Sequence, residues 1–435
     1  MSGEKSFEIL NKIFKPIHKK DISKVKGYTM QYGHIYDGEK IIDEVLVSYF
    51  KAPKSYTTED MCEINSHGGN IVMRKILEIC LKNGAELAEP GEFTKRAFLN
   101  GRIDLSQAES VIDIINAKSE REAKTGIKQL EGSLSNEIAK IKQEILDVMV
   151  NVDVSIDYPE YDVEDVTNSQ ISEMLDSVQK KLETLEKSFD NGKLIKEGIK
   201  TAIIGKPNAG KSSLLNAILK EDRAIVTEYE GTTRDTIEEF VNIDGVPLKL
   251  IDTAGIRDAK DEVEKIGIEK AREQLKHCDF CILILDRSRE IEEEDKILLK
   301  EIESKKAVIL YNKSDLENAF SIDEIENMTT KKIIAFSAKT GEGLEELQQY
   351  ITNQFFQNEI SFNQEIYLSN ERQKQAVSEA YESLLRVKES YDLGVGEDFY
   401  TIDMMNAYEQ LGSIIGETVD DDLVDTIFSD FCMGK

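Results

Sequence analysis

The sequence predicts a multidomain α+β protein, in which an N-terminal α+β domain precedes an all-α helical domain that an inserted α/β domain interrupts. Three patterns support this. The first hundred residues mix short alternating runs with turn signals, two later blocks repeat apolar residues every three or four positions, and strands alternate with helices between those blocks. The expected boundaries are 1–98, 99–197, 198–357 and 358–435.

The N-terminal domain is expected to contain a hairpin, a further strand and a helix. "YTMQYGHIYDGEKIIDEVLVSYF" has two β-rich stretches around Asp37-Gly38, a dipeptide typical of tight hairpin turns. "MCEINSHGGN" predicts a strand that enters a glycine turn, and the stretch from Ile71 to Leu81 predicts a helix. The domain is therefore small and mixed.

The helical domain is predicted from apolar periodicity on both sides of the insert. Two helices are expected before the insert, and they are broken at "DYPEYD", where Pro159 cannot continue a helix. Helical spacing returns after Ser369 and runs to Phe431, interrupted by "LGVGED". Because the insert divides one domain, its flanks must meet in space. The tail "FCMGK" is therefore expected to be held by the helical domain.

The insert is expected to form a mostly parallel sheet. Its apolar runs are "IKTAIIG", "VPLKLID", "FCILILD", "AVILYNK" and "KIIAFSA", and a helical stretch separates most of them. Cys278 and Cys281 in "HCDFC" superficially resemble a metal or redox pair. Cys281, however, opens a buried strand and no second pair exists, so both thiols are expected to be structural.

Composition narrows the class of protein. The chain has 435 residues, a net charge of −29 and five cysteines, an odd number that favours reduced thiols in a cytoplasm. No apolar run is long enough for a membrane helix, and no signal peptide is visible at the start. The charge argues against nonspecific adhesion to nucleic acid. Eleven carboxylates and no Lys or Arg lie between Tyr391 and Met433, so an RNA is expected to avoid this segment.

Four motifs at strand ends predict a nucleotide site. "GKPNAGKS" follows a strand and opens a helix, which is the context of a phosphate-binding loop with Lys211 on the outer phosphates and Ser212 on Mg²⁺. "DTAG", "NKSD" and "SAK" each end a strand. Asp315 can accept two hydrogen bonds from guanine, which adenine cannot supply. The ordered set predicts a Ras-like P-loop G domain that binds GTP.

"EGTTRD" lies where the first switch loop belongs, and Thr233 is the natural second hydroxyl for Mg²⁺. The full set of predicted nucleotide-binding residues is Asn208, Ala209, Gly210, Lys211, Ser212, Ser213, Thr227, Glu228, Tyr229, Glu230, Gly231, Thr232, Thr233, Asp252, Thr253, Ala254, Gly255, Asn312, Lys313, Ser314, Asp315, Ser337, Ala338 and Lys339.

The catalytic group for hydrolysis is less evident. Ras-type GTPases place a Gln directly after DTAG to orient the attacking water, whereas this chain has Ile256. Asn208 offers an amide oxygen that can help to bind a monovalent cation in place of an arginine finger. The candidate carboxylates for the water are Asp258, Asp261, Glu262 and Glu264, and the residues alone do not choose among them.

The chain resembles the TrmE/MnmE family of tRNA-modification GTPases over essentially its whole length. The resemblance rests on "GKPNAGKSS", "GTTRD", "DTAGIRDAKDEVEKIGI", "HGG", "PGEFTKRAFLNGRIDL" and the terminal C-x-G-K. It implies modification of the wobble uridine of tRNA at carbon 5. It also implies a homodimer through the N-terminal domains, and G domains that pair in the transition state with K⁺ bound. The K⁺ ligands would be Asn208, Thr227, Tyr229 and Thr232, and Glu264 would orient the water.

The resemblance also implies a one-carbon donor of the 5-formyltetrahydrofolate type. Glu63 and Arg102 match the family's folate positions, with Lys435 reaching across and Cys432 near the one-carbon unit. Family members usually have a further strand ending in Arg before the Ser-Gly that is Ser2-Gly3 here, so that contact is not expected from this chain.

The implied partners are the anticodon region of tRNA and a flavin-dependent protein of the MnmG/GidA type, in a heterotetramer. Two alternatives stay open. The first is an RNA- or ribosome-assembly GTPase that acts as a switch without modification chemistry, because ribosome-assembly GTPases share GTTRD and DTAG. A folate-dependent transferase with a merely regulatory G domain is the other.

Overall fold

The structure is a computed structural model that describes residues 1–18, 27–157, 164–221, 239–243, 246–251, 265–355, 366–395, 398–429, 431 and 434. The chain divides into two compact units. Unit 1 contains Met1–Ile112, Gln129–Val178 and Glu379–Lys435, and unit 2 contains Asp113–Lys128 and Gln179–Ser378. The four expected domain boundaries stay a prediction, because the two units follow different boundaries.

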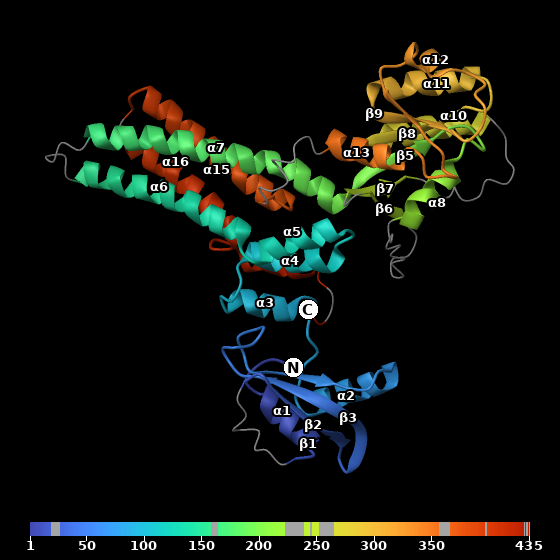
Figure 1. The fold of residues 1–435 in the computed structure, drawn as a ribbon. Coiled ribbons are helices and arrows are strands. Elements are labelled where there is room, and N and C mark those ends of the chain that lie inside the picture. The colour runs from blue at the N-terminus through green and yellow to red at the C-terminus, as the bar shows by residue number, and fades with distance from the viewer. Residues whose placement is uncertain are drawn as a thin grey trace. The chain divides into compact units, whose positions relative to one another are not determined.

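The N-terminal part of unit 1 is a four-stranded antiparallel sheet covered on one face by helices (Figure 1). Its strands follow the order β1-β2-β3-β4, and residues such as Leu10, Val47 and Ile79 form its core. The hairpin predicted around Asp37-Gly38 joins β2 and β3. The elements are α1 (Ser6–Ile13), β1 (Phe14–Pro16), β2 (Thr29–Asp37), β3 (Lys40–Phe50), β4 (Met61–Asn65), α2 (Asn70–Lys82) and α3 (Glu92–Leu99).

Long helices make up the rest of unit 1. Within this unit α6 packs against α16, Asn151 of α6 donates to Gln170 of α7 at 3.0 Å, and Arg386 of α15 pairs with Asp403 of α16 at 2.8 Å. The predicted break at "DYPEYD" falls on residues 158–163, outside the described ranges. The helices of this region are α4 (Leu105–Asn116), α5 (Glu120–Leu130), α6 (Ser133–Asp157), α7 (Glu164–Glu197), α15 (Glu371–Asp392), α16 (Asp398–Ile415) and α17 (Asp421–Ser429). Most of α5, the end of α4, the second half of α7 and the start of α15 belong to unit 2.

The C-terminal segment is fixed within unit 1. Phe431 is 4% exposed and its ring centroid lies 5.1 Å from that of Phe428. Phe428 also contacts Phe98 of α3. Gly91, in the left-handed region at φ +67, precedes α3, and a Cβ there would lie 2.9 Å from the Phe431 side chain. The expectation that the tail is held is therefore met as far as Phe431.

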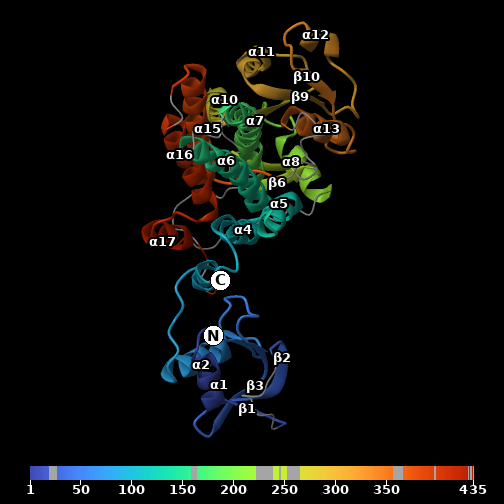
Figure 2. The ribbon, with the colours of Figure 1, turned by 90° about the vertical axis from the view of Figure 1, so that its left-hand side faces the viewer.

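Unit 2 is built on a six-stranded sheet with helices on both faces. The strand order is β10-β9-β8-β5-β7-β6, and all pairs are parallel except β6 with β7. The core on one face contains residues of α8 and α13, and that on the other contains residues of α10, α11 and α12. Figure 2 shows α11 and α13 to either side of β9.

The strands of unit 2 are β5 (Ile199–Ile204), β6 (Glu239–Ile243), β7 (Val246–Leu250), β8 (Phe280–Asp286), β9 (Lys306–Asn312) and β10 (Lys332–Ala335). The helices between and after them are α8 (Lys211–Glu221), α10 (Lys265–His277), α11 (Glu293–Glu301), α12 (Ile322–Glu326) and α13 (Leu344–Phe355), with a 3₁₀ turn at Ile302–Ser304. The expected mostly parallel sheet is confirmed, and β6 is a strand that the sequence patterns did not single out.

Candidate guanine-nucleotide site

The predicted phosphate-binding loop connects β5 to α8, as the sequence requires. Gly205 has φ +145, and a Cβ at this position would lie 2.5 Å from the carbonyl oxygen of Ile284. Gly210 has φ +113, and a Cβ there would lie 2.1 Å from Nδ2 of Asn312. Glycine is thus required at both positions by the backbone and by close neighbours. The loop ends where α8 begins, so the N-terminus of that helix points its free amides toward the loop.

Lys211 is folded onto the loop that precedes it. Its Nζ donates to the carbonyl oxygens of Gly205 at 2.6 Å and of Lys206 at 2.8 Å. Burial, together with the nearby charge of Arg289, lowers the pKa of Lys211 to about 8. A phosphate group would supply the negative charge that this buried ammonium needs.

Asn312 joins the phosphate loop to the base-recognition motifs. Its Nδ2 donates to the carbonyl oxygen of Ala209 at 2.7 Å, and its Oδ1 accepts from the backbone N–H of Ala338 at 3.4 Å. Asn312 is 2% exposed. One buried side chain therefore links the "GKPNAGKS", "NKSD" and "SAK" motifs, which lie far apart in the sequence.

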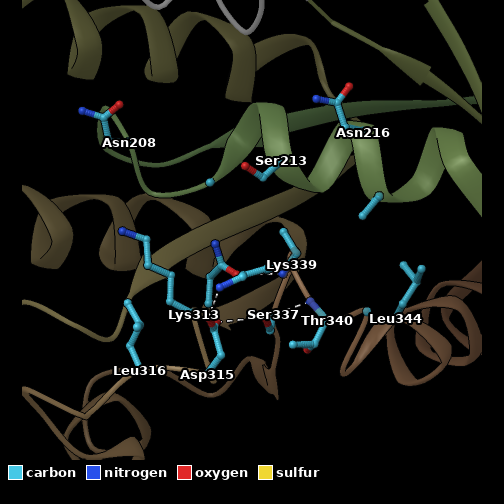
Figure 3. Close-up of a pocket in the computed structure, with 15 residues that line it drawn as sticks. Asn208, Ser213, Asn216, Lys313, Asp315, Leu316, Ser337, Lys339, Thr340 and Leu344 are labelled. Atoms are coloured by element: carbon cyan, nitrogen blue, oxygen red, sulfur yellow. Dashed lines mark hydrogen bonds and ion pairs between the residues drawn. The ribbon is translucent and has the colours of Figure 1, made fainter.

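Asp315, the residue predicted to read guanine, lies beside Ser337 in the pocket drawn in Figure 3. Its Oδ1 accepts from Ser337 Oγ at 3.0 Å, and its Oδ2 lies 3.9 Å from Lys339 Nζ. Lys313 has φ +66, and its ammonium donates to Asp286. Burial raises the pKa of Asp286, but hydrogen bonds from Lys313 and Ser288 outweigh it and the pKa is lowered. The Asp315 carboxylate, which would read guanine, is thus held by Ser337, and Lys313 is held by Asp286.

A cavity of about 770 Å³ lies between the phosphate loop, Asn312 and Asp315. Nine predicted residues line it: Asn208, Gly210, Ser213, Asn312, Lys313, Asp315, Ser337, Ala338 and Lys339. Six further lining residues were not predicted: Asn216, Ala217, Leu316, Thr340, Gly341 and Leu344. Asn216 follows Ser212 by four positions on α8, so helical spacing alone could have pointed to it.

Other predicted residues of the site have separate outcomes. Ser212 lies in the first turn of α8 and Ser314 Oγ donates to Glu342. The predictions for residues 227–233 and 252–255 and for Glu264 lie outside the described residues, as do Ile256, Asp258, Asp261 and Glu262. They stay predictions.

The predicted folate residues lie in unit 1. Glu63 is exposed on β4, where it is opposite Ser48 of β3. Arg102 donates from Nη1 to the carbonyl oxygen of Tyr56 at 2.9 Å and stacks over the Tyr56 ring at 4.6 Å. The structure shows no bond between Glu63 and Arg102. Cys432 and Lys435 lie outside the described residues.

The two thiols of "HCDFC" are free and buried, as expected. Burial raises the pKa of both Cys278 and Cys281. Among the described residues no cluster of His, Cys, Asp and Glu could hold a metal ion. No helix in the described ranges is long and apolar enough to span a membrane.

Comparison with known proteins places the whole chain. The model of the MnmE helical domain matches residues 105–432, and that of the GTP-binding protein TrmE N-terminus matches residues 1–102. A solved structure of the FeoB G domain from Methanococcus jannaschii covers 36% of this chain and 97% of its own, at 24% identity and a TM-score of 0.27.

Curated relatives agree with the family models. The tRNA modification GTPases MnmE of Acetivibrio thermocellus and Clostridioides difficile are each 47% identical to this chain, and that of Lachnoclostridium phytofermentans is 49% identical. In each case the match covers 100% of this chain and 95% of the relative. The chain therefore belongs to the MnmE family of tRNA modification GTPases.

Proposed function

We propose that this chain hydrolyses GTP in the cavity between the phosphate loop and Asp315, and that hydrolysis drives modification of the wobble uridine of tRNA at carbon 5. The observation that supports this best is the pair of contacts made by Asn312, which join the phosphate loop to the guanine-reading motifs. Because Asn312 contacts both segments, it links the position of the phosphate loop to that of the residues predicted to bind guanine.

Guanine selectivity is tested at Asp315. Its carboxylate can accept from the amino group and the ring N–H of guanine, and an amide at this position can accept only one of them. We expect Asp315→Asn to weaken GTP binding at least about a hundredfold, because a buried polar group of the base is left unpaired, and to bind xanthosine triphosphate instead. Glu317→Gln, an exposed neighbour, is the matched control. Unchanged GTP affinity in Asp315→Asn would refute this assignment.

The metal ions and the attacking water belong to the same proposal. Ser212 and Thr233 would hold Mg²⁺, and Asn208, Thr227, Tyr229 and Thr232 would hold K⁺. Asn208 has φ +62 and lines the cavity, which is consistent with a side chain near the phosphates. Hydrolysis should be faster in K⁺ than in Na⁺, and equal rates would remove Asn208 from this role.

Glu264 is proposed to orient the attacking water. Glu264→Ala should abolish turnover without loss of nucleotide affinity, and normal turnover would mean that another residue orients the water.

We also propose that Glu63, Arg102 and Lys435 bind a 5-formyltetrahydrofolate-type donor, with Cys432 beside the one-carbon unit. Arg102 is already oriented by Tyr56, and the tail is anchored next to α3 by Phe431. Calorimetric titration with 5-formyltetrahydrofolate should show binding that Arg102→Ala abolishes and Lys40→Ala, an exposed control, preserves. Binding that survives in Arg102→Ala would place the folate elsewhere.

Dimerisation through the N-terminal domain has support from its outer face. Met30 and Tyr32 of β2 and Ile41 and Leu46 of β3 are 58%, 49%, 53% and 41% exposed, and Tyr32 is directly opposite Leu46. Exposed apolar side chains gathered on one face of a sheet are typical of an interaction surface, which supports the proposal. Leu46→Glu should convert a homodimer to a monomer by light scattering, and a monomeric wild type would contradict the proposal.

The partners complete the proposal: the anticodon region of tRNA and a flavin-dependent MnmG/GidA-type protein in a heterotetramer in the cytoplasm. The group added to carbon 5 of the uridine would be an aminomethyl or a carboxymethylaminomethyl group. Co-purification of the flavoprotein with this chain, and its loss on Leu46→Glu or on removal of GTP, would test the assembly. Sedimentation with ribosomal particles and normal wobble uridines in a deletion strain would favour an assembly switch instead.

A further inference from the structure

A short helical segment from early in the chain is part of the nucleotide-binding unit. Residues Asp113–Lys128, which comprise the end of α4 and most of α5, cluster with Gln179–Ser378 and not with the residues that flank them in sequence. Residues 129–198 separate this segment from β5 in the sequence. Its contacts with the G domain therefore need a specific explanation.

The main contact joins Lys118 to the β6–β7 hairpin. The Nζ of Lys118 lies 3.7 Å from the centroid of the Phe240 ring, within the range of a strong cation–π interaction. Phe240 is on β6, where it pairs with Lys249 of β7. Lys249 Nζ is 5.9 Å from the same ring. A cation from outside the α/β domain is thus closer to this ring than the cation on the hairpin itself.

The backbone of Lys118 is fixed by a hydrogen bond within its own segment. Its backbone N–H donates to a carboxylate oxygen of Glu122 at 2.6 Å, and the Glu122 N–H donates to Ser119 Oγ at 3.1 Å. Ser119 thus caps the start of α5, and the Glu122 carboxylate accepts from the residue before this cap. Glu122 is only 5% exposed, so this turn is a buried, ordered feature.

The segment is also attached to the helix that leads into the sheet. Asp113 pairs with Lys196, in the last turn of α7, at 2.7 Å. Gly198, between α7 and β5, has φ +77. A Cβ on Gly198 would lie 3.0 Å from the Pro247 carbonyl oxygen and 3.3 Å from the Phe240 ring. The β6–β7 hairpin therefore has two contacts with this region: Lys118 lies over the Phe240 ring, and Gly198, after α7, lies close to Pro247 and Phe240.

The hairpin connects the two predicted switch segments. In the sequence, "EGTTRD" ends four residues before Glu239, and "DTAG" begins two residues after Leu250. We propose that Lys118 is a positioning residue for GTP hydrolysis: it holds the β6–β7 hairpin in place, and with it the strand ends that border the two switch motifs in the sequence. This inference rests on the proposed GTPase site and assigns part of its rate to a residue outside the G domain.

The test is steady-state GTP hydrolysis by the full chain in K⁺ and Mg²⁺, together with affinity for a fluorescent GDP. Lys118→Ala should lower kcat about fivefold, the scale of one partly buried cation–π contact, with GDP affinity unchanged. Lys118→Arg should restore most of the rate. Lys118→Met keeps the aliphatic stem and serves if the alanine variant does not fold. Lys124→Ala, an exposed lysine on the same helix, is the matched control.

A double-mutant cycle makes the test specific. If the contact with the ring is what matters, Phe240→Leu should lower kcat similarly, and the double variant should be no slower than either single variant. Full additivity, an unchanged kcat in Lys118→Ala, or a parallel loss of GDP affinity would each overturn the inference. A wild-type chain that does not hydrolyse GTP would instead overturn the proposed function beneath it.

Discussion

Lys211 combines the positive charge that a phosphate requires with a partly buried position. Its lowered pKa of about 8 results from burial and from Arg289, while a bound phosphate would raise the pKa again. Below about pH 8 the ammonium is already charged. Above about pH 8 it must take up a proton when a nucleotide binds, so affinity should fall as pH rises, by up to about tenfold per pH unit.

Calorimetry of GDP binding in buffers of different ionisation enthalpy measures this proton directly. We expect no proton uptake at about pH 7 and uptake approaching one proton at about pH 9. Repeating the experiment with Lys211→Arg, whose charge is permanent, should remove the uptake. Proton uptake that persists in Lys211→Arg would mean that another group titrates.

Glu122 is a second residue whose charge is costly. Burial raises its pKa to about 7; hydrogen bonding and the charges of Lys118 and Lys196 oppose this, and Asp113 adds to it. The folded chain therefore binds a proton here that the unfolded chain has lost above about pH 4.5. The contribution of Glu122 to the free energy of unfolding is therefore fully present below about pH 4.5 and is lost as the pH rises through about 7.

Glu122→Gln should accordingly stabilise the protein at about pH 8, by on the order of 1–3 kcal/mol, and have little effect near pH 4.5. The amide oxygen can still accept from the Lys118 N–H. Thermal unfolding of Glu122→Gln, compared with Glu120→Gln on the exposed side of the same helix, checks this. A pH-independent difference between the two variants would contradict it.

At the scale of elements, the phosphate loop is fastened to α11. Lys206 is 6% exposed, and its ammonium pairs with Glu292, with Glu294 at 3.4 Å and with Asp295 at 3.6 Å. Asp295 is itself buried and forms the capping box of α11 with Glu292. Removal of the lysine would leave the buried Asp295 carboxylate with the Glu292 N–H as a donor but without this cation, which is expected to cost about 1–3 kcal/mol.

Lys206→Met should therefore lower the unfolding temperature and weaken GDP and GTP binding to the same extent, since the loop backbone loses its anchor. Lys206→Arg should retain part of both properties. Lys296→Ala, exposed on α11, is the control. Nucleotide affinity at the wild-type level in a folded Lys206→Met protein would show that the loop needs no such anchor.

Sequence patterns predicted elements where a strong local signal exists. The β2–β3 hairpin, α2 and the buried strand β8 follow from turn residues, helical spacing and an apolar run. The edge strand β6 was missed because "EFVNI" is only five residues long and follows a charged stretch. Its strand character depends on pairing with β7, which a local pattern does not contain.

The same distinction applies to the site. Motif residues such as Lys211 and Asp315 were predicted because the chemistry demands them at fixed spacing. Ala217 and Leu344 line the cavity because of how α8 and α13 pack on the sheet, and nothing in their identity marks them. The attachment of Asp113–Lys128 to the nucleotide unit likewise depends on tertiary contacts such as Lys118 with Phe240.

At the scale of the whole molecule, the chain combines a nucleotide site in unit 2 with the predicted one-carbon residues in unit 1. The chain belongs to a family of tRNA modification GTPases. If GTP turnover drives the modification, a chain that cannot bind GTP should fold, yet leave tRNA unmodified.

The decisive measurement is mass spectrometry of anticodon nucleosides from cells whose only copy of this protein is either wild type or Asp315→Asn. Wild-type cells should contain the C5-modified wobble uridine, and Asp315→Asn cells should contain the unmodified nucleoside, with equal amounts of the protein in both. Full modification in Asp315→Asn cells, with purified Asp315→Asn protein unable to bind GTP, would contradict the account.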